Sequence, residues 1–240
     1  MKNDIKLLII IRHGERTDRV GEIPKCGTLN PELTDKGKKQ SFLAGKLTIK
    51  SIQKYGIKNI SPNMIQIRTS PYMRTIQTSV QIIKVFNLFF EENNTNDKLN
   101  KIYIDFDLKK RIVPNKKIDK NEFLYKTAET YINFDQDLKE IEFLGDKGEF
   151  SLEAETKEQC EKRSYDYYEN ILKKNIENDN ENKIFIIVGH RGCLKHILKK
   201  LGYNLKNKNM FDYCTQFFFD ISNGLNQAKF LEHLDKPSLW

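Results

Sequence analysis

The chain has 240 residues, of which 38% are hydrophobic and 11% aromatic, enough apolar material for a buried core and too much for a wholly disordered chain. Its longest apolar runs, at 7–11 and 184–188, are too short to span a bilayer or to form a signal-peptide core. The four cysteines include no Cys-x-x-Cys pair, which excludes a disulfide framework or a zinc cluster. We expect no membrane partner and a cytoplasmic location, with the nucleus as the alternative.

The net charge of +8 is compatible with nucleic acid, because phosphate backbones attract basic surfaces. The lysines, however, are spread along the chain as pairs in segments typical of solvated helix faces and loops. They accompany no zinc-finger, KH or RRM signature. A nucleic-acid-associated protein is therefore the weakest of three hypotheses, and the charge favours another anionic ligand.

The first half of the chain alternates between strand and helix patterns. The apolar segment 5–11 predicts a central strand buried on both faces. Thr34 predicts the N-cap of a helix, and 64–67 predicts a short strand. Ser70-Pro71 has the pattern of a helix start, with a capping side chain followed by proline at the first helical position.

The second half continues this alternation. Its predicted elements are a helix that begins at a Thr156-x-x-Gln159 capping box, a buried strand at 184–188, a helix at 192–201 and late strands at 217–221 and 229–231. We expect a single domain over 1–240, with an insertion at about 89–150 that includes a helix at 121–131. The order of elements predicts an α/β fold, a three-layer α/β/α arrangement around a mostly parallel sheet.

Ligands of such sheets bind outside the carboxyl ends of the strands. The two clearest strands end in Arg12-His13 and in Gly189-His190, so two imidazoles would meet there if the strands are neighbours. Arg16 and Arg74 are placed to converge on the same point. Imidazole can act as a nucleophile toward phosphorus, and one guanidinium group can donate hydrogen bonds to two phosphoryl oxygens at once. The residues thus indicate a site for an anionic phosphate ester.

The sequence resembles the histidine phosphatase (phosphoglycerate mutase-like) superfamily. The motifs that carry the resemblance follow in family order: Arg12-His13-Gly14-Glu15-Arg16, Leu33-Thr34-Asp35-Lys36-Gly37 with Gln40, Thr69-Ser70-Pro71 with Arg74 and Gln77-Thr78, Glu155-Thr156 with Arg163, Val188-Gly189-His190, and His233-Leu234. Together they span nearly the whole chain. The fold of that superfamily agrees with the α/β fold predicted above.

The resemblance implies a role for each matching residue. His13 would be the nucleophile, Arg12 and Arg74 would bind the phosphate, and His190 would donate hydrogen bonds to the phosphoryl group. Arg16 is similar to the variant of the motif found in phosphatase domains of T-cell-receptor signalling suppressors, where it would face the substrate. The resemblance implies no metal or other cofactor, and a phosphorylated small molecule or phosphoprotein as substrate.

One catalytic element is missing from the match. The superfamily places a glutamate two residues after a leucine beyond the helix that follows Ser70-Pro71, and this chain has Lys110 at the corresponding place after Leu108. Asp105, Asp107 or Glu122 could replace this glutamate as the general acid. The remaining alternative is that the chain has no general acid. The leading hypothesis is a phosphomonoesterase that forms phospho-His13. The second is a weak or inactive relative that binds phosphorylated ligands or serves as an assembly subunit.

Overall fold

The computed structural model describes residues 5–237, apart from 26, 28, 96, 114–134, 147–152, 180, 182, 204–210 and 236. Its centre is a seven-stranded sheet in the order β4-β3-β2-β5-β1-β6-β7. The strands are β1 (Leu7–Arg12), β2 (Ile65–Thr69), β3 (Lys101–Ile104), β4 (Glu142–Gly145), β5 (Ile184–Gly189), β6 (Gln216–Asp220) and β7 (Lys229–Leu234). Neighbours from β4 to β1 run parallel, and β6 is antiparallel to both β1 and β7.

The strands β1 and β5 lie side by side at the middle of the sheet, as their apolar sequences predict. Residues 7–11 of β1 and all of β5 are buried, because helices cover both faces of the sheet. The two strands are in register from Leu7 opposite Ile184 to Arg12 opposite Gly189. Their carboxyl ends therefore lie at the same edge, and so do the residues that follow each strand.

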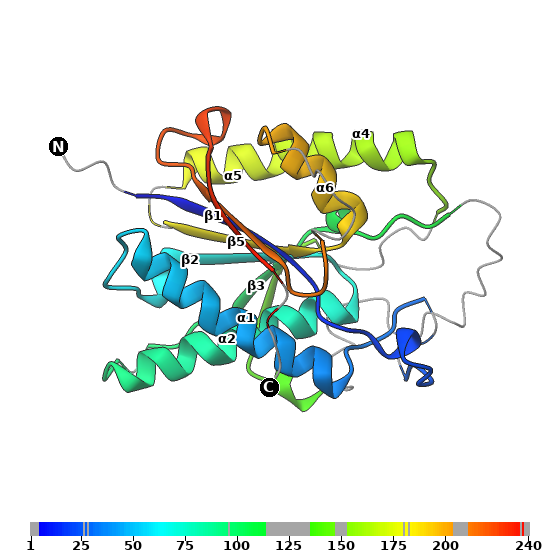
Figure 1. Cartoon of the computed structure of the whole chain (residues 1–240), viewed down its shortest axis with the longest axis horizontal. Coiled ribbons are helices and arrows are strands. Elements are labelled where there is room, and N and C mark those ends of the chain that lie inside the picture. Colours follow the sequence, from blue (N-terminus) through cyan, green and yellow to red (C-terminus); the bar gives the residue numbers. More distant parts are fainter. Residues whose placement is uncertain are drawn as a thin grey trace.

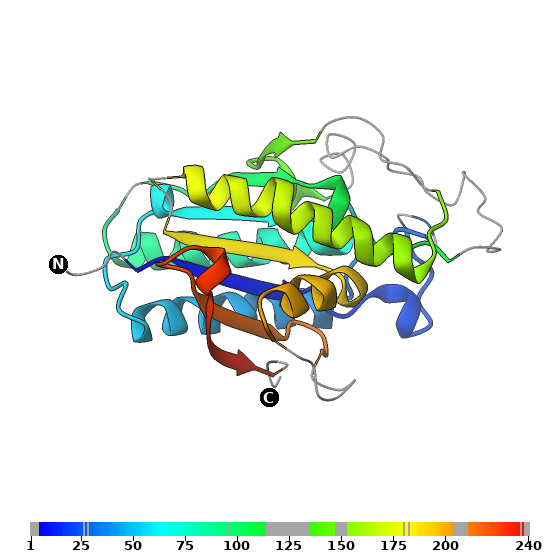
Figure 2. The same cartoon turned by 90° about the horizontal axis from the view of Figure 1, so that it is seen from above.

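Two pairs of helices enclose the sheet (Figures 1 and 2). The helices α1 (Asp35–Lys54) and α2 (Met73–Glu92) pack on one face, where Ile9 and Ile11 belong to their apolar cluster. The other face carries α6 (Arg191–Lys200) and a long helix made of α4 (Lys157–Tyr167), a π-helical turn (Tyr168–Leu172) and α5 (Lys173–Asn178). This arrangement confirms the three-layer α/β/α fold class.

The helix caps agree with the sequence, except at α2. Thr34 caps α1 by accepting a hydrogen bond from the Gly37 amide at 2.8 Å, and Thr156 and Gln159 form the capping box of α4. The prediction that Ser70 caps α2 is wrong. This helix begins at Met73 after an N-cap at Tyr72 that makes no side-chain cap bond, because the Ser70 hydroxyl is bonded to His190 instead.

The range in which we expected an insertion contributes to the sheet. Within it, β3 and β4 extend the parallel strands beyond β2. The expected helix at 121–131 and Glu122 lie outside the described residues. The single-domain boundary at 1–240 stays a prediction.

Candidate active site

His13 and His190 meet where β1 and β5 end. The His13 amide donates to the Gly189 carbonyl at 3.2 Å, which continues the pairing of the two strands for one more residue. The imidazole rings are 5.2 Å apart between centroids, and each residue is only 3% exposed. Two titratable rings that are 177 positions apart in the chain thus form one buried cluster, as the pairing of the strand ends predicts.

The loop after β1 is held by close backbone contacts. A Cβ atom on Gly14 would lie 2.5 Å from the Gly37 carbonyl oxygen in the first turn of α1. The Gly14 amide donates to Thr78 Oγ1 on α2 at 3.1 Å. From the other side, the Cys214 amide donates to the carbonyls of Arg12 (3.1 Å) and His13 (3.3 Å). His13 is therefore fixed from three directions, which explains why glycines are required in the two matching motifs.

The hydrogen bonding of His13 defines its tautomer. Its Nδ1 atom lies 2.8 Å from the Gly14 carbonyl oxygen. A carbonyl can only accept, so Nδ1 carries the proton. Burial, followed by the charges of Arg74 and Arg12, lowers the pKa of His13 well below 6.5. The ring is therefore neutral at neutral pH, and Nε2 bears the lone pair, which is the form that attacks an electrophile.

One ring nitrogen of His190 is hydrogen-bonded, and the other is open within the part of the chain that the structure describes. Its Nε2 atom lies 2.9 Å from Ser70 Oγ, and the ring of Tyr72 packs edge-on at 5.0 Å. Its Nδ1 atom is buried and has no hydrogen-bond partner within the described part of the chain. Burial and the charge of Arg74 lower the pKa of His190 well below 6.5. A buried polar atom without a partner inside a fold is a place where a ligand can bind.

Three arginines expected at the site surround the two rings differently. Arg74 is fully buried, with its guanidinium 4.5 Å from the Tyr72 ring, and its charge is the strongest acting on both imidazoles. Arg12 packs on Tyr213 at 4.3 Å and donates from Nη1 to the Phe211 carbonyl at 2.6 Å. Arg16 is 8% exposed and forms a two-bond ion pair with Asp18, each bond 2.6 Å long. Its charge still lowers the pKa of both histidines.

The candidate carboxylates differ more than their spacing suggests. Asp105 is 3% exposed, accepts two hydrogen bonds from Arg68 (2.7 and 2.6 Å) and accepts a third from Tyr167 at 2.7 Å. Its oxygens are thus engaged in a buried ion pair. Asp107 is half-buried, and burial raises the pKa of its carboxyl. Glu122 lies outside the described residues.

Several residues of the site carry no sequence signal of their own. Tyr72 is almost fully buried against His190, and burial raises its pKa to about 12, so its phenol stays protonated. Tyr213 packs between His13, at 5.8 Å, and Arg12. Neither follows from a local pattern. The matched motif could have identified Ser70 as a site residue. Its bond to His190 could not be predicted, because the two residues are 120 positions apart in the sequence.

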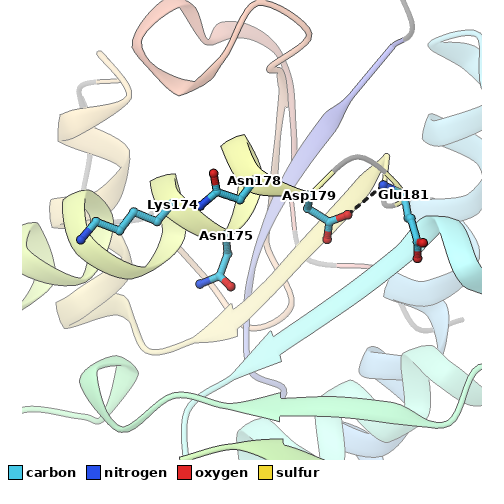
Figure 3. A pocket seen from close by; sticks show the side chains of 5 residues that line it. All are labelled: Lys174, Asn175, Asn178, Asp179 and Glu181. Atoms are coloured by element: carbon cyan, nitrogen blue, oxygen red, sulfur yellow. Dashed lines mark hydrogen bonds between the residues drawn. The ribbon is translucent and has the colours of Figure 1, made fainter.

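A hollow lies at the end of the sheet opposite the two histidines. It has a volume of about 500 Å³ and is lined by Lys174, Asn175, Asn178, Asp179 and Glu181 (Figure 3). Asp179 and Glu181 precede β5, whereas His190 follows it, so the six residues of the strand, about 20 Å, separate the hollow from the histidines. Two of its side chains are carboxylates, which do not favour a phosphate. The hollow is therefore separate from the candidate active site.

Among the residues that the structure describes, no group of three or more histidine, cysteine, aspartate or glutamate side chains is arranged to hold a metal ion. In the same part of the chain, no helix combines the length and apolarity that a membrane span requires.

Comparison with known proteins agrees with this geometry. Residues 8–105 match the model of the histidine phosphatase superfamily (branch 1). No curated protein matches the sequence. Among solved structures, the ecdysone phosphate phosphatase of Bombix mori, in complex with tungstate, is 17% identical over 98% of this chain and 95% of its own, with a TM-score of 0.64. The phosphoserine phosphatase of Entamoeba histolytica, in complex with 3-phosphoglyceric acid, is 18% identical over 95% of both chains, with a TM-score of 0.51.

At these identities the solved structures establish the fold, and the family model establishes the signature around His13. The chain carries the sequence signature of the histidine phosphatase superfamily (branch 1) over residues 8–105, and it has the phosphoglycerate mutase-like fold of that superfamily throughout its described part.

Proposed function

We propose that the protein is a phosphomonoesterase that acts through a phosphohistidine on His13. The observation that carries this proposal is the tautomer of His13. The Gly14 carbonyl holds the proton on Nδ1, and a lowered pKa keeps the ring neutral, so Nε2 is a nucleophile at neutral pH. The substrate is an anionic phosphate ester of a small molecule or a phosphoprotein.

The reaction has two steps. In the first, His13 Nε2 forms a bond to phosphorus as the ester P–O bond breaks, and the leaving oxygen takes a proton from an acid. In the second, a water oxygen attacks phosphorus, the N–P bond breaks, and the conjugate base of that acid takes the water proton. Arg74, Arg12 and the open Nδ1 of His190 are the groups placed to bind the phosphoryl oxygens, whose charge they stabilise in the transition state.

Of the described candidates, Asp107 is the carboxyl suited to donate the proton. Burial raises the pKa of both Asp105 and Asp107, and a raised pKa favours the protonated form that a general acid needs. The hydrogen bonds of Asp105 distinguish the two. Asp105 is held by Arg68 and Tyr167 and is unsuited to exchange protons with a substrate. We therefore assign the acid role to Asp107.

The related structures support the substrate class. The ecdysone phosphate phosphatase and the phosphoserine phosphatase are each named for a small phosphate ester, and the first binds tungstate, an oxyanion that resembles phosphate. Arg16 supports a closer kinship with the phosphatase domains of the T-cell-receptor signalling suppressors. We therefore also propose that the chain is related to those domains and that Arg16 contacts the substrate.

A second candidate function is a non-catalytic phospholigand-binding protein. Lys110 favours it, because a lysine stands where the superfamily has its catalytic glutamate. Loss of the acid impairs turnover more than binding, since the acid acts in the transition state. The arginines and histidines would then still bind a phosphate group.

The deciding experiment measures hydrolysis of phenyl phosphate between pH 4.5 and 7.5 in the presence of EDTA, with wild type beside His13→Ala. The proposal expects turnover in wild type, none in His13→Ala, and an acid-labile phosphoenzyme in rapidly quenched wild-type samples. Full activity in His13→Ala would overturn it. Absence of turnover in a folded protein that still binds vanadate would establish the second function.

A further inference from the structure

We propose that Gln40 is a positioning residue, which fixes the tautomer of His13 through the main chain. This inference rests on the proposed function, because the tautomer matters for turnover only if His13 is the nucleophile. It deepens that proposal by naming the side chain that prepares the imidazole for attack. Gln40 lies on α1 and acts on the nucleophile rather than on the substrate.

The peptide group that joins Gly14 to Glu15 is hydrogen-bonded on both sides. Its carbonyl oxygen, which belongs to Gly14, lies 2.8 Å from His13 Nδ1. Its N–H group, which belongs to Glu15, donates to Gln40 Oε1 at 3.0 Å. The N–H and C=O of a trans peptide group lie in one plane and point in opposite directions. An acceptor that holds the N–H on one side therefore aims the carbonyl at the imidazole on the other.

Rotation of this peptide group would reverse the tautomer. A half-turn would present the Glu15 N–H to His13 Nδ1 in place of the carbonyl, so Nδ1 would have to accept and the proton would lie on Nε2. Gly14 precedes the group, and glycine restricts such a rotation less than any other residue. The peptide groups before and after it are held by Thr78 Oγ1 and by the Thr34 amide. Gln40 holds the one between them.

The first turn of α1 brings the Gln40 amide to this peptide group. A Cβ atom on Gly37 would overlap the main chain of Glu15, and one on Gly14 would lie 2.5 Å from the Gly37 carbonyl oxygen. Because both positions are glycine, the loop after the first strand lies directly on the helix. Gly37 and Gln40 are three residues apart, which places them on the same face of α1. The Gln40 side chain is fully buried there.

The orientation of the Gln40 amide is fixed by its partner. A backbone N–H can only donate, so the side-chain atom that faces Glu15 is the carbonyl oxygen. Gln40 Nε2 is buried and has no hydrogen-bond partner within the described part of the chain. A buried amide nitrogen without a partner lowers stability, and a methionine would fill a similar volume without this cost. Packing alone therefore does not account for glutamine at this position, whereas its oxygen does.

The test determines the tautomer directly. Nitrogen NMR of isotopically labelled protein distinguishes a protonated ring nitrogen from one that bears a lone pair, and a spectrum of His13→Gln identifies the His13 signals among the four histidines of the chain. Gln40→Met removes the acceptor with little change in side-chain length. We expect the proton on Nδ1 in wild type, and a shift of the tautomer equilibrium toward Nε2 in Gln40→Met.

The rate should follow the tautomer. In Gln40→Met we expect kcat for phenyl phosphate to fall about 10- to 100-fold, as is typical when a hydrogen bond that orients a functional imidazole is lost. KM should change by less than about threefold, because Gln40 acts on the nucleophile and not on substrate binding. A merely structural role would change stability, and it would leave the tautomer of the folded protein as it is in wild type.

Two further variants serve as controls. Gln77→Met is matched to Gln40→Met, since Gln77 is also buried and its Oε1 also accepts from a backbone amide, that of Leu33 at 2.8 Å. That amide is not in the peptide group that faces His13, so Gln77→Met should keep the wild-type tautomer. Gln40→Glu keeps an acceptor oxygen in the same place and should retain the Nδ1 proton. It tests the inference even if Gln40→Met does not fold.

The inference is overturned if wild type carries the proton on Nε2, if Gln40→Met keeps the wild-type tautomer, or if Gln40→Glu loses it. Because the tautomer is measured without turnover, the inference and the proposed function can fail separately. A tautomer that depends on Gln40 in a protein without phosphatase activity would refute the function alone. An active phosphatase whose tautomer does not depend on Gln40 would refute this inference alone.

Discussion

Two neighbouring regions of the site are built from opposite kinds of interaction. At the ends of β1 and β5, neutral imidazoles and guanidinium groups are buried together, and His190 Nδ1 has no partner among the described residues. In the segment 105–111, polar groups are largely satisfied within the protein: Asp105 by Arg68 and Tyr167, and two backbone carbonyls by Arg163. The first region offers an unbonded nitrogen to a ligand, whereas the polar groups of the second are hydrogen-bonded to the rest of the protein.

Under the proposed function, phosphate binding and proton transfer therefore belong to separate parts of the structure. The strand ends are held by the central sheet, whereas the segment is held by α4, by α6 and by its bonds to β2. We expect a side-chain substitution in one region to act mainly on that region, and the following experiments test this.

Replacing Arg74 should have the largest effect. Arg74→Met removes the strongest charge acting on both imidazoles, and loss of one such group from a transition state typically costs 10²- to 10³-fold in rate. We expect kcat/KM for phenyl phosphate to fall by about 10³. Arg19→Met, at an exposed arginine of the neighbouring turn, is the control and should be unchanged. Since Arg74 is fully buried, thermal unfolding of both variants, and of Arg74→Lys, shows whether the fold is kept.

Replacing Asp107 should break only the second region. A general acid matters most when the leaving group is a poor one, so Asp107→Asn should lower kcat for an alkyl phosphate about 100-fold. Its effect on 4-nitrophenyl phosphate, whose leaving group needs no proton, should stay below about fivefold. Equal losses on both esters would remove Asp107 from the acid role.

Replacing Asp105 should act on stability. Asp105→Asn should lower the free energy of unfolding, measured in urea, by about 3 to 5 kcal/mol, because it breaks a buried ion pair.

The pH dependence of stability should report on the strand ends. The folded-state pKa values of His13 and His190 lie well below 6.5, so as the pH falls through 6.5 the unfolded chain takes up protons first. Each ring should then cost about 1 kcal/mol of folding stability between pH 7.5 and 5.5. Urea unfolding of wild type should show this loss, and the double variant His13→Gln/His190→Gln should lose about 2 kcal/mol less. Equal losses in both proteins would mean ordinary pKa values.

The smallest effect should come from the helix caps. Thr156→Ala removes the capping box of α4, which carries Arg163, and Thr34→Ala removes the cap of α1 beside the His13 loop. Each should lower the free energy of unfolding by about 1 kcal/mol. Thr156→Ala should affect alkyl phosphates more than aryl phosphates, whereas Thr34→Ala should affect both alike. Urea unfolding curves measure the stability of both variants. The ratio of kcat for an alkyl phosphate to kcat for an aryl phosphate, measured in each variant, tests the difference between them.

The sequence predicted the strand ends well because their signals are local. Five consecutive apolar residues in β1 and in β5 indicate strands buried on both faces, and the motifs that follow place the histidines. β3 and β4 escaped prediction because they are four-residue strands with polar, half-exposed positions. Their pairing with β2 and with each other supplies what their own sequences lack.

The roles of the carboxylates could not be predicted, for a different reason. Asp105 and Asp107 are equivalent in spacing and charge, and only the approach of Arg68 from β2 and of Tyr167 from α4 distinguishes them. The Ser70 hydroxyl similarly has a choice between a helix cap and a histidine that is distant in sequence. Contacts between distant elements decide both cases, and no local pattern contains them.

The two hydrogen bonds from the Cys214 amide to the carbonyls of Arg12 and His13 have a consequence for how the protein is made. His13 follows the first strand of the sheet, yet its backbone is held by β5 and by Cys214, which lies 201 residues further along the sequence. No nascent chain that ends before Cys214 can hold His13 in this arrangement. Shortened products that end before Cys214 should therefore lack this arrangement, and under the proposed function they should be inert toward phosphate esters.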